Sequence, residues 1–302
     1  MSSKTPLISI ITLNYNQALV TLDFLESAKE LQYKNFEILV CDMASAEDVT
    51  QIIHPHKYPN TRLLLSKENL GFAGGNNWGM RQAKGDFYFI VNNDTELTKD
   101  LLDNLLRPFS EDATIGVTTP KIKFFDQPDT IQYAGFYPMN LYTGRTSIRG
   151  EWEKDMGQYN ISGPTSGSHG CAMLVKKEVV DKTGKFPEKF FLYYEEWDWS
   201  ARILAAGYKI WYTANATIYH KESMSVGKNN PMKVYYQTRN RVLYMRRNTK
   251  WYQLVVFSLF FTFFSIPKSL LKFLLNKKYK QIRFFLKGAF WNLYSSSSSS
   301  TY

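Results

Sequence analysis

The chain has 302 residues, 44% of them apolar, which is enough to bury one large core or two modest ones. From Lys221 onward there are 15 Lys and Arg and one acid, Glu222, so this end has a net charge of +14. Because the whole chain has a net charge of +10, the first 220 residues have a net charge of −4. Cys41 and Cys171 lie inside apolar runs, which indicates buried thiols and excludes a disulfide framework. We therefore expect the protein in a reducing cytoplasm, and the start of the chain shows no charged and apolar leader that would indicate secretion.

The first hundred residues alternate short β-branched runs with amphipathic stretches. Strands are predicted over 7–13, 36–42, 62–66 and 86–93, and helices over about 18–31, briefly after residue 42, and from about residue 76. This alternation predicts a parallel sheet covered by helices on both faces. Polar residues follow three of the strands, at 12–16, 42–45 and 92–95. We expect them on one rim, where ligands of such sheets bind.

The rest of the chain has a different pattern. Residues 116–185 predict irregular short strands and Gly, Pro and Ser loops that line a site. A helix is expected from Glu195, ending at Gly207 and followed by a strand. Beyond Pro231 come a basic helix and an aromatic, Lys-rich stretch. We therefore predict a catalytic domain over 1–230, a helical C-terminal region over 231–294 and a low-complexity tail over 295–302.

The run IVNNDTE, residues 90–96, brings a carboxylate to the predicted rim. Asp94 is a hard oxygen ligand of the kind that Mg²⁺ or Mn²⁺ prefers. Such an ion would neutralise the charge that develops on a leaving diphosphate. The alternative is that Asp94 or Thr95 caps the helix predicted after it.

Three carboxylates, Glu195, Glu196 and Asp198, crowd within YYEEWDWSAR. Crowding and aromatic neighbours raise a carboxylate's pKa, and a carboxylate tuned in this way can act as a general base toward a hydroxyl. The alternative is that these acids only complement the dipole of a helix N-terminus.

Three further polar residues are candidates for ligand binding. His220, at the end of ATIYH, could complete a metal site, or it could be structural. Asp42 could accept a hydrogen bond from the imide N–H of uracil or thymine, or form an Asx turn. Asn76, in a Gly-rich run, is expected at a helix N-terminus, facing a phosphate or sugar oxygen. The spacing of the glycines matches neither GxGxxG nor a P-loop.

In this order, these segments resemble glycosyltransferase family 2, especially the rhamnosyltransferase-like members that build bacterial surface polysaccharides. The resemblance covers roughly residues 5–247. The matching pieces are LISIITLNYN, CDMAS, ENLGFAGGNN, VNNDTE, SGSHGCAMLVKKEV, FFLYYEEWDWSARILAAGYKI and IYHKES. The resemblance implies a GT-A fold, an α/β architecture with a mostly parallel central sheet, and an inverting displacement at the anomeric carbon. It also implies a nucleotide-diphosphate leaving group held by Mg²⁺ or Mn²⁺.

The resemblance also implies roles for individual residues. The base falls on Glu196, with Asp198 also pointing into the acceptor site, and the choice between the two stays open. Asp94 would hold the metal, and His220 would complete its site. His169 and Trp197 are candidate acceptor-site groups, for which simple packing is the alternative. The residues expected around the donor are Thr12, Asn14, Tyr15, Asp42, Asn76, Asn92 and Asn93.

The apolar run 254–266 has thirteen residues, short of the roughly 20 that a membrane-spanning helix needs. Because Pro267, Lys268 and Lys272 follow, we expect helices that lie on an anionic membrane surface, at the cytoplasmic face of the inner membrane. The alternative is a helical subdomain packed on the core. Nucleic-acid binding is not favoured, because the basic residues alternate with aliphatic runs.

The sequence thus predicts transfer of a sugar, from a UDP or dTDP donor such as dTDP-rhamnose, to a hydroxyl of a glycan or a polyprenyl-diphosphate-linked acceptor. A nucleotidyltransferase is the first alternative, but it would favour a Gly-rich basic loop after the first strand, where LNYNQALV stands. The second alternative is an inactive scaffold that binds nucleotide sugar. Loss of the base carboxylates would have indicated a scaffold, and they are present.

Overall fold

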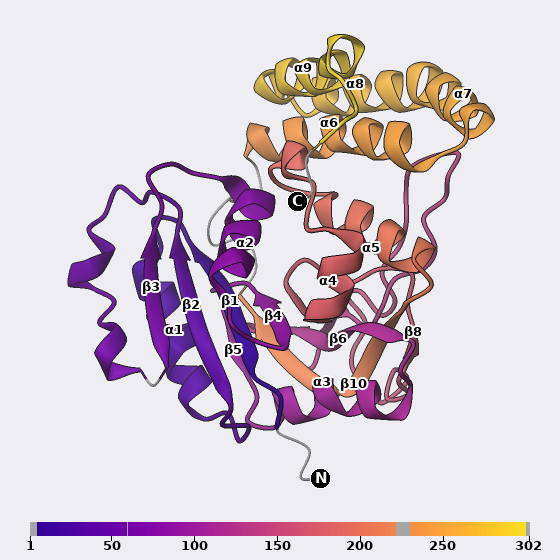
Figure 1. Ribbon diagram of the computed structural model, residues 1–302. Coiled ribbons are helices and arrows are strands. Elements are labelled where there is room, and N and C mark those ends of the chain that lie inside the picture. The colour runs from indigo at the N-terminus through magenta and orange to yellow at the C-terminus, as the bar shows by residue number, and fades with distance from the viewer. Residues whose placement is uncertain (1–4, 59, 222–229, 300–302) are drawn as a thin grey trace.

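The computed structural model describes residues 5–58, 60–221 and 230–299 (Figure 1). A single curled sheet runs through the catalytic part of the chain, and helices cover both of its faces. The strand order is β3-β2-β1-β4-β9-β6-β10-β5, with β7 beside β6 and β8 beside β10. The predicted α/β class is confirmed.

The first half of the sheet is parallel, as predicted. It consists of β1 (Ile8–Asn14), β2 (Phe36–Asp42), β3 (Thr61–Leu65) and β4 (Phe87–Val91). Strand β1 alternates between two apolar clusters: Ile8 and Ile10 face helix α1 (Ala18–Lys29), whereas Ile11 faces helix α2 (Gly71–Gln82). Two short 3₁₀ turns, Val49–Gln51 and Pro55–Lys57, stand where a short helix was expected.

Helix α2 begins at Gly71, five residues before the predicted start. Its glycines are explained by close packing on the sheet, because a Cβ at Gly79 would lie 2.5 Å from Ile11 Cγ2 and one at Gly75 would lie 2.7 Å from Met43 Sδ. The helix therefore continues through residues that predict a loop. This places Asn76 in the second turn rather than at the N-terminus, and the prediction for its position was wrong.

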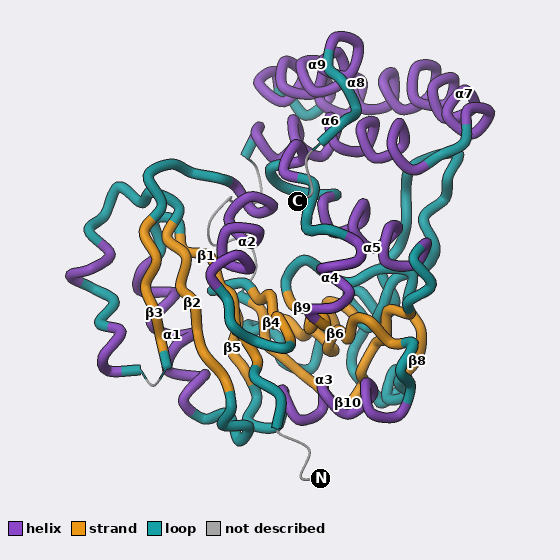
Figure 2. Tube along the Cα trace, in the orientation of Figure 1, coloured by secondary structure: helices purple, strands orange, loops and turns teal. Residues whose placement is uncertain are grey.

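The second half of the sheet is mixed. It contains β5 (Thr95–Leu97), β6 (Ile115–Phe124), β7 (Ile131–Tyr133), β8 (Gly163–Pro164), β9 (Ala172–Lys176) and β10 (Lys209–His220). Strand β9 runs antiparallel to both of its neighbours, whereas β6 and β10 are parallel. Residues 134–162 form the long loop, teal in Figure 2, that leads from β7 to β8.

Strands β6 and β9 correct the prediction of irregular structure over 116–185. Strand β6 was hidden because Pro120 and two lysines interrupt its β-branched pattern. Pro120 is tolerated because it pairs with Thr213 at a register shift of β10. Lys121 is tolerated inside the sheet because its ammonium binds Asp155 at 3.1 Å and Asn160 at 2.6 Å.

Three helices complete the catalytic part: α3 (Leu101–Glu111), α4 (Lys177–Thr183) and α5 (Glu195–Ala205). Helix α3 covers the same face of the sheet as α1, whereas α4 and α5 cover the face of α2. A 3₁₀ turn, Glu188–Phe190, precedes α5. Helix α5 begins at the predicted residue, and the predicted strand follows it.

The C-terminal region is helical, as predicted. Helix α6 (Pro231–Asn248) packs against α5 and against α9 (Tyr279–Tyr294), while α7 (Trp251–Phe260) and α8 (Ile266–Leu275) are joined by a π-helical turn, Phe261–Ser265. In Figure 1 these orange and yellow helices lie on the side of α5 away from the sheet. The predicted boundary at residue 230 precedes α6, but packing between α5 and α6 crosses it.

Residues Trp251–Leu275 form one continuous helix, which corrects the expectation that Pro267 limits its length. Pro267 lies in the first turn of α8, and the π-helical turn before it accommodates the ring. The helix has 25 residues, a mean hydropathy of 1.9 over its most apolar 18-residue window, and 17% of that window buried. By length and composition alone, it could cross a membrane.

Candidate functional site

A chain of buried polar side chains connects the carboxyl ends of β1, β2 and β4. Asn14 Nδ2 donates to Asp42 Oδ1 at 2.7 Å, and Asn14 Oδ1 accepts from Thr21 Oγ1 at 2.8 Å. Asn93 Nδ2 donates to Thr21 Oγ1 at 2.9 Å, and Ser45 N donates to Asp42 Oδ2 at 3.0 Å. The expectation of one polar rim is confirmed. Sequence reasoning missed Thr21, because it lies inside a helix and belongs to no motif.

The other residues expected near the donor are placed less uniformly. Tyr15 is exposed beside this rim, whereas Thr12 is fully buried and its hydroxyl contacts no hydrogen-bond partner among the described residues. Asn92 is partly buried, and its backbone N–H donates to the Cys171 carbonyl at 2.9 Å. Asn76 Nδ2 donates to Phe72 O at 2.9 Å, so this amide is engaged within helix α2.

Asp94 and His220 are brought together by the antiparallel pairing of β5 with β10, in which Thr95 is the register partner of His220. Asp94 Oδ1 lies 3.1 Å from His220 Nε2, and both side chains are buried. Helix α3 starts only at Leu101, with Asp100 at its N-cap, so Asp94 does not cap it.

The pair formed by Asp94 and His220 fits a divalent ion. Two neighbouring ligands of an octahedral Mg²⁺ at ~2.1 Å lie about 3 Å apart, close to the separation of these two atoms. Within the described ranges, no cluster of three or more His, Cys, Asp or Glu residues could hold a metal. Asp94 and His220 would supply two ligands and leave positions for phosphate oxygens and water, an arrangement that Mg²⁺ commonly adopts.

The surroundings of His220 favour its charged form. Burial alone would lower its pKa, but the nearby sulfur of Cys171 and the Asp94 carboxylate outweigh burial and hold the pKa well above its usual value. Gln132 Oε1 lies 2.8 Å from His220 Nδ1 and fixes the other side of the ring. Sequence reasoning missed Gln132, because a lone glutamine in a three-residue strand gives no signal.

Glu196 lies in the first turn of α5, half-buried beside Gly170 and Phe72. Burial raises the pKa of Glu196 to about 7, while backbone N–H groups at the start of α5 oppose the rise. Its Oε2 has no hydrogen-bond partner among the described residues. The pKa of neighbouring Glu195 is also raised, by burial and then by the charge of Glu196. Glu196 thus combines a raised pKa with an oxygen that can accept a proton.

Asp198 is placed differently from Glu196, because two residues along a helix point to nearly opposite sides. Asp198 is buried and binds Arg202 Nε at 3.2 Å, Arg247 Nε at 2.6 Å and Asn248 Nδ2 at 2.9 Å. Its carboxylate therefore ties α5 to α6. This geometry does not support the prediction that Asp198 points into the acceptor site.

His169 and Trp197 pack against the same ring, that of Phe136. His169 stacks on it with centroids 5.8 Å apart, and its Nδ1 accepts from Cys171 N at 3.1 Å. Burial, followed by the charge of His220, lowers the pKa of His169 to about 3, so the ring is neutral. Trp197 is buried 4.6 Å from Phe136 between centroids, a position that favours packing over contact with a sugar.

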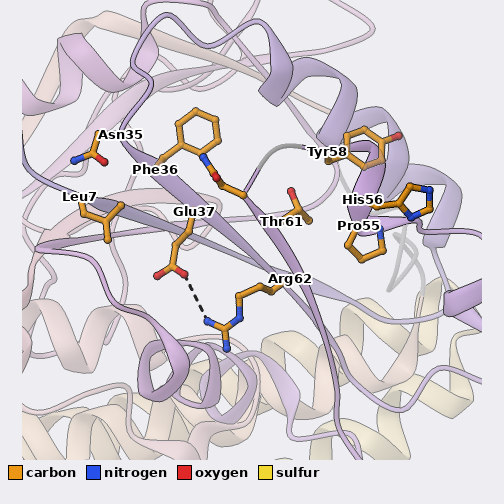
Figure 3. A pocket seen from close by; sticks show the side chains of 10 residues that line it. Leu7, Asn35, Phe36, Glu37, Pro55, His56, Tyr58, Thr61 and Arg62 are labelled. Atoms are coloured by element: carbon orange, nitrogen blue, oxygen red, sulfur yellow. Dashed lines mark ion pairs between the residues drawn. The ribbon is translucent and has the colours of Figure 1, made fainter.

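Two pockets lie outside the polar rim. The larger, about 610 Å³, opens at the amino ends of β2 and β3 beside the Glu37–Arg62 ion pair (Figure 3). The smaller, about 250 Å³, lies between α6, α8 and α9. Neither is lined by a predicted site residue, and the larger lies at the end of the strands opposite Asp42.

Two bacterial proteins are similar to this chain in sequence. The N-acetylglucosaminyl-diphospho-decaprenol L-rhamnosyltransferase of Mycobacterium tuberculosis (strain ATCC 25618 / H37Rv) is 24% identical over 247 residues, covering 74% of this chain and 79% of that protein. Protein y4gI of Sinorhizobium fredii (strain NBRC 101917 / NGR234) is 27% identical over 263 residues. That match covers 82% of this chain but only 28% of the relative's length.

Solved structures share the fold. The mannosyltransferase PcManGT from Pyrobaculum calidifontis, in complex with GDP-Man and Mn²⁺, gives a TM-score of 0.61 at 15% identity, covering 97% of this chain and 88% of that one. TarS 1-349 of S. aureus, in complex with UDP-GlcNAc, gives 0.58 at 18% identity, covering 93% and 81%. The family model for glycosyl transferase family 2 matches residues 9–184, more than half of the chain. This chain belongs to glycosyltransferase family 2 and is a glycosyltransferase with the GT-A fold.

Proposed function

We propose that this glycosyltransferase moves a sugar from a nucleotide-diphosphate donor to an acceptor hydroxyl, with inversion at the anomeric carbon and Glu196 as the general base. The observation that carries the proposal is the Glu196 carboxylate, with a pKa raised to about 7 and an Oε2 that accepts no hydrogen bond from the part of the chain that the structure describes. A base whose pKa lies near neutral pH is well matched to removing a hydroxyl proton.

In this reaction the Glu196 carboxylate takes the proton of the acceptor hydroxyl as that oxygen attacks the anomeric carbon. The bond between the sugar and the diphosphate breaks at the opposite face, and the electron pair leaves with the nucleotide diphosphate. Asp94 and His220 would hold Mg²⁺ or Mn²⁺, which when bound neutralises charge on the leaving phosphate. PcManGT was solved with Mn²⁺, which supports a divalent cofactor in this fold.

The donor is proposed to be a UDP- or dTDP-sugar, such as dTDP-rhamnose. Asn14 and Ser45 fix the Asp42 carboxylate, which can accept the imide N–H of uracil or thymine. The acceptor is proposed to be a glycan or polyprenyl-diphosphate-linked hydroxyl in the synthesis of a bacterial surface polysaccharide. The printed name of the M. tuberculosis relative supports both a rhamnosyl donor and a lipid-linked acceptor.

The C-terminal helices are proposed to lie on an anionic membrane at its cytoplasmic face. Trp251, Leu259, Phe263 and Phe264 are exposed on α7 and the π-helical turn, and the chain has no acid from residue 230 onward. Phe261 on the same helix packs against Phe285 of α9, so lipid would not surround the helix on all sides. An apolar face bordered by lysines supports a peripheral, interfacial placement.

A thermal-shift panel of UDP, dTDP, GDP and CDP and their sugars, with and without Mn²⁺, tests donor binding, because a ligand of the native state raises Tm. A manganese-dependent rise with UDP or dTDP but not CDP is expected. Assays of donor turnover then compare the wild type with Glu196→Gln, which should keep nucleotide binding and lose transfer. Nucleotide-sugar binding with no turnover by the wild type, across a panel of lipid-linked acceptors, would instead favour an inactive scaffold.

A further inference from the structure

The segment that leads into α5, residues 189–194, is held in an unusual backbone conformation. Phe191, Tyr193 and Tyr194 have φ angles of 65°, 70° and 72°, in the left-handed region that favours glycine. Such a conformation is unfavourable for a residue with a side chain and persists only where the surrounding structure imposes it. Since Tyr194 is also the N-cap residue of α5, whatever imposes this conformation sets where α5 begins.

Asn240 of helix α6 binds this segment through three carbonyl groups. Its Nδ2 lies 2.9 Å from Phe190 O, 2.7 Å from Leu192 O and 2.8 Å from Tyr193 O. Asn240 is fully buried, so its amide has no competing contact with bulk water. A single side chain of the C-terminal region thus fixes three carbonyls of the strained segment.

Arg239 adds to this hold and orients Asn240. Its Nη2 donates to Lys189 O at 2.7 Å and to Phe190 O at 2.6 Å, and its Nε donates to Asn240 Oδ1 at 2.7 Å. The amide of Asn240 is therefore fixed with its oxygen toward Arg239 and its nitrogen toward the segment.

The remaining carbonyl before Tyr194, that of Phe191, is held by helix α2. Phe191 O accepts from Phe72 N at 2.7 Å and from Ala73 N at 3.2 Å. Gly71 permits this approach, since a Cβ there would lie 2.6 Å from the same oxygen. Every carbonyl from residue 189 to 193 is thus bound by α2 or α6, and four of the five are bound by Arg239 and Asn240.

The segment is connected directly to Glu196. Glu196 lies two residues after Tyr194, the N-cap of α5, and in the first turn of that helix, so the position of its carboxylate follows the backbone at the start of α5. We propose that Arg239 and Asn240 of α6 are positioning residues for Glu196, which hold the strained segment 189–194 in the conformation that places this carboxylate at the acceptor hydroxyl. This inference rests on the proposed role of Glu196 as general base.

The test compares Asn240→Ala, Asn240→Asp and Arg239→Lys with the wild type of the full chain. Asn240→Asp keeps the size and the oxygen that binds Arg239 but loses donation to the three carbonyls. Arg246→Ala is the matched control: it lies on the same helix, and its contacts, Asn292 and the Ser295 carbonyl, do not touch the segment. We measure kcat, the KM for the donor, the pH profile of kcat, Tm and the thermal shift with nucleotide.

We expect kcat to fall about 10²-fold in both Asn240 variants, since a displacement of ~1 Å at a reacting group can cost this much. Donor KM and the nucleotide thermal shift should stay near wild type. A relaxed segment hydrates Glu196 and lowers its pKa, so the acidic limb of the kcat profile should move to lower pH. Arg239→Lys keeps a donor for the carbonyls and should lose less activity, and Arg246→Ala should match the wild type.

Normal kcat in Asn240→Asp would overturn the inference, as would a lower kcat with an unchanged pH profile, because that pattern indicates a structural role only. If Asn240→Ala does not fold, Asn240→Asp and Arg239→Lys decide by the same criteria. An active Glu196→Gln would refute the proposed base itself. An inactive Glu196→Gln beside a normal Asn240→Asp would refute only the positioning role.

Discussion

Gln132 Oε1 lies 2.8 Å from His220 Nδ1, so the imidazole turns its other nitrogen, Nε2, toward Asp94. An amide oxygen at Nδ1 keeps a proton there, and the lone pair of neutral His220 then belongs to Nε2. Two electron-rich atoms, Nε2 and Asp94 Oδ1, need a cation to stay 3.1 Å apart. A proton serves this purpose in the metal-free chain, and a divalent ion would serve it in the loaded enzyme.

Replacing Gln132 with leucine should therefore weaken metal binding. The loss of an outer-shell partner typically lowers metal affinity by 10–100-fold, and we expect a loss of about tenfold or more. Titration of free Mn²⁺ by electron paramagnetic resonance measures this without any turnover. Gln51→Leu, at an exposed position in a surface turn, is the control. Equal Mn²⁺ affinity in Gln132→Leu and the wild type would rule out this role.

Asp94→Asn should abolish metal-stimulated turnover. The substitution keeps the size of the side chain but removes the charge that a divalent ion requires. Turnover measured against Mn²⁺ concentration should lose its dependence on the metal, and the manganese-dependent part of the nucleotide thermal shift should disappear. If the Mn²⁺ dependence of Asp94→Asn stays normal, Asp94 is not the metal ligand.

Activity and stability should respond to pH in opposite directions. Glu196 must lose its proton to act as a base, so kcat should rise as the pH passes about 7. The folded chain binds this proton more tightly than the unfolded chain, whose carboxyl has the ordinary value of 4.5. The stability that the protonated group contributes is therefore fully present below pH 4.5 and is lost as the pH rises through 7.

Thermal unfolding between pH 4.5 and 7.5 measures the second effect, and Glu196→Gln provides the comparison. The variant cannot ionise at this position, so its Tm should fall less with rising pH than that of the wild type. Parallel Tm curves for the two proteins would contradict the raised pKa.

Asp198→Asn should affect stability far more than the chemical step. Removing the charge leaves Arg247 and Arg202 without their shared carboxylate, which costs on the order of 3 kcal/mol of unfolding free energy for a buried pair. Chemical denaturation measures the loss. Asp181→Asn removes an exposed ion pair with Lys177 and should cost little. A stable Asp198→Asn that lacks turnover would return Asp198 to the candidates for base.

The double variant Phe263→Ser, Phe264→Ser should reduce binding to anionic liposomes. Both rings are 67% exposed, so their loss removes apolar surface that would enter the lipid without creating a cavity in the core. Sedimentation with vesicles of increasing anionic lipid content measures binding. Ile161→Ser, 87% exposed on the catalytic part, is the control. Unchanged liposome binding of the double variant would favour helices that only pack on the core. Wild-type protein that stays in the membrane during extraction with alkaline carbonate would indicate a spanning helix.

The sequence predicted most of the sheet because β1, β2 and β4 carry short apolar runs of β-branched, leucine and aromatic residues, and it predicted the rim because polar residues end these strands. It could not reveal β6, whose proline and lysines are compensated by Thr213, Asp155 and Asn160, residues distant in the chain. It could not decide between Glu196 and Asp198 as the general base. What distinguishes them is that Asp198 is bound by arginines and an asparagine of two helices, and these contacts appear only in the folded chain. Asn76 was misplaced because glycines that serve helix packing resemble those of a loop.

The π-helical turn at Phe261–Ser265 sets the rotational phase of the long C-terminal helix. Phe257, Phe261 and Ser265 are all buried, a strict spacing of four that an ideal α-helix, at about 100° per residue, would not keep in line. If the same five residues formed regular α-helix instead, they would take up more rotation than they do in the wider π-helical turn, and everything after them would turn about the helix axis. Lys268 and Lys272 would then swing away from their present side of the helix, although no contact in α8 itself had been changed.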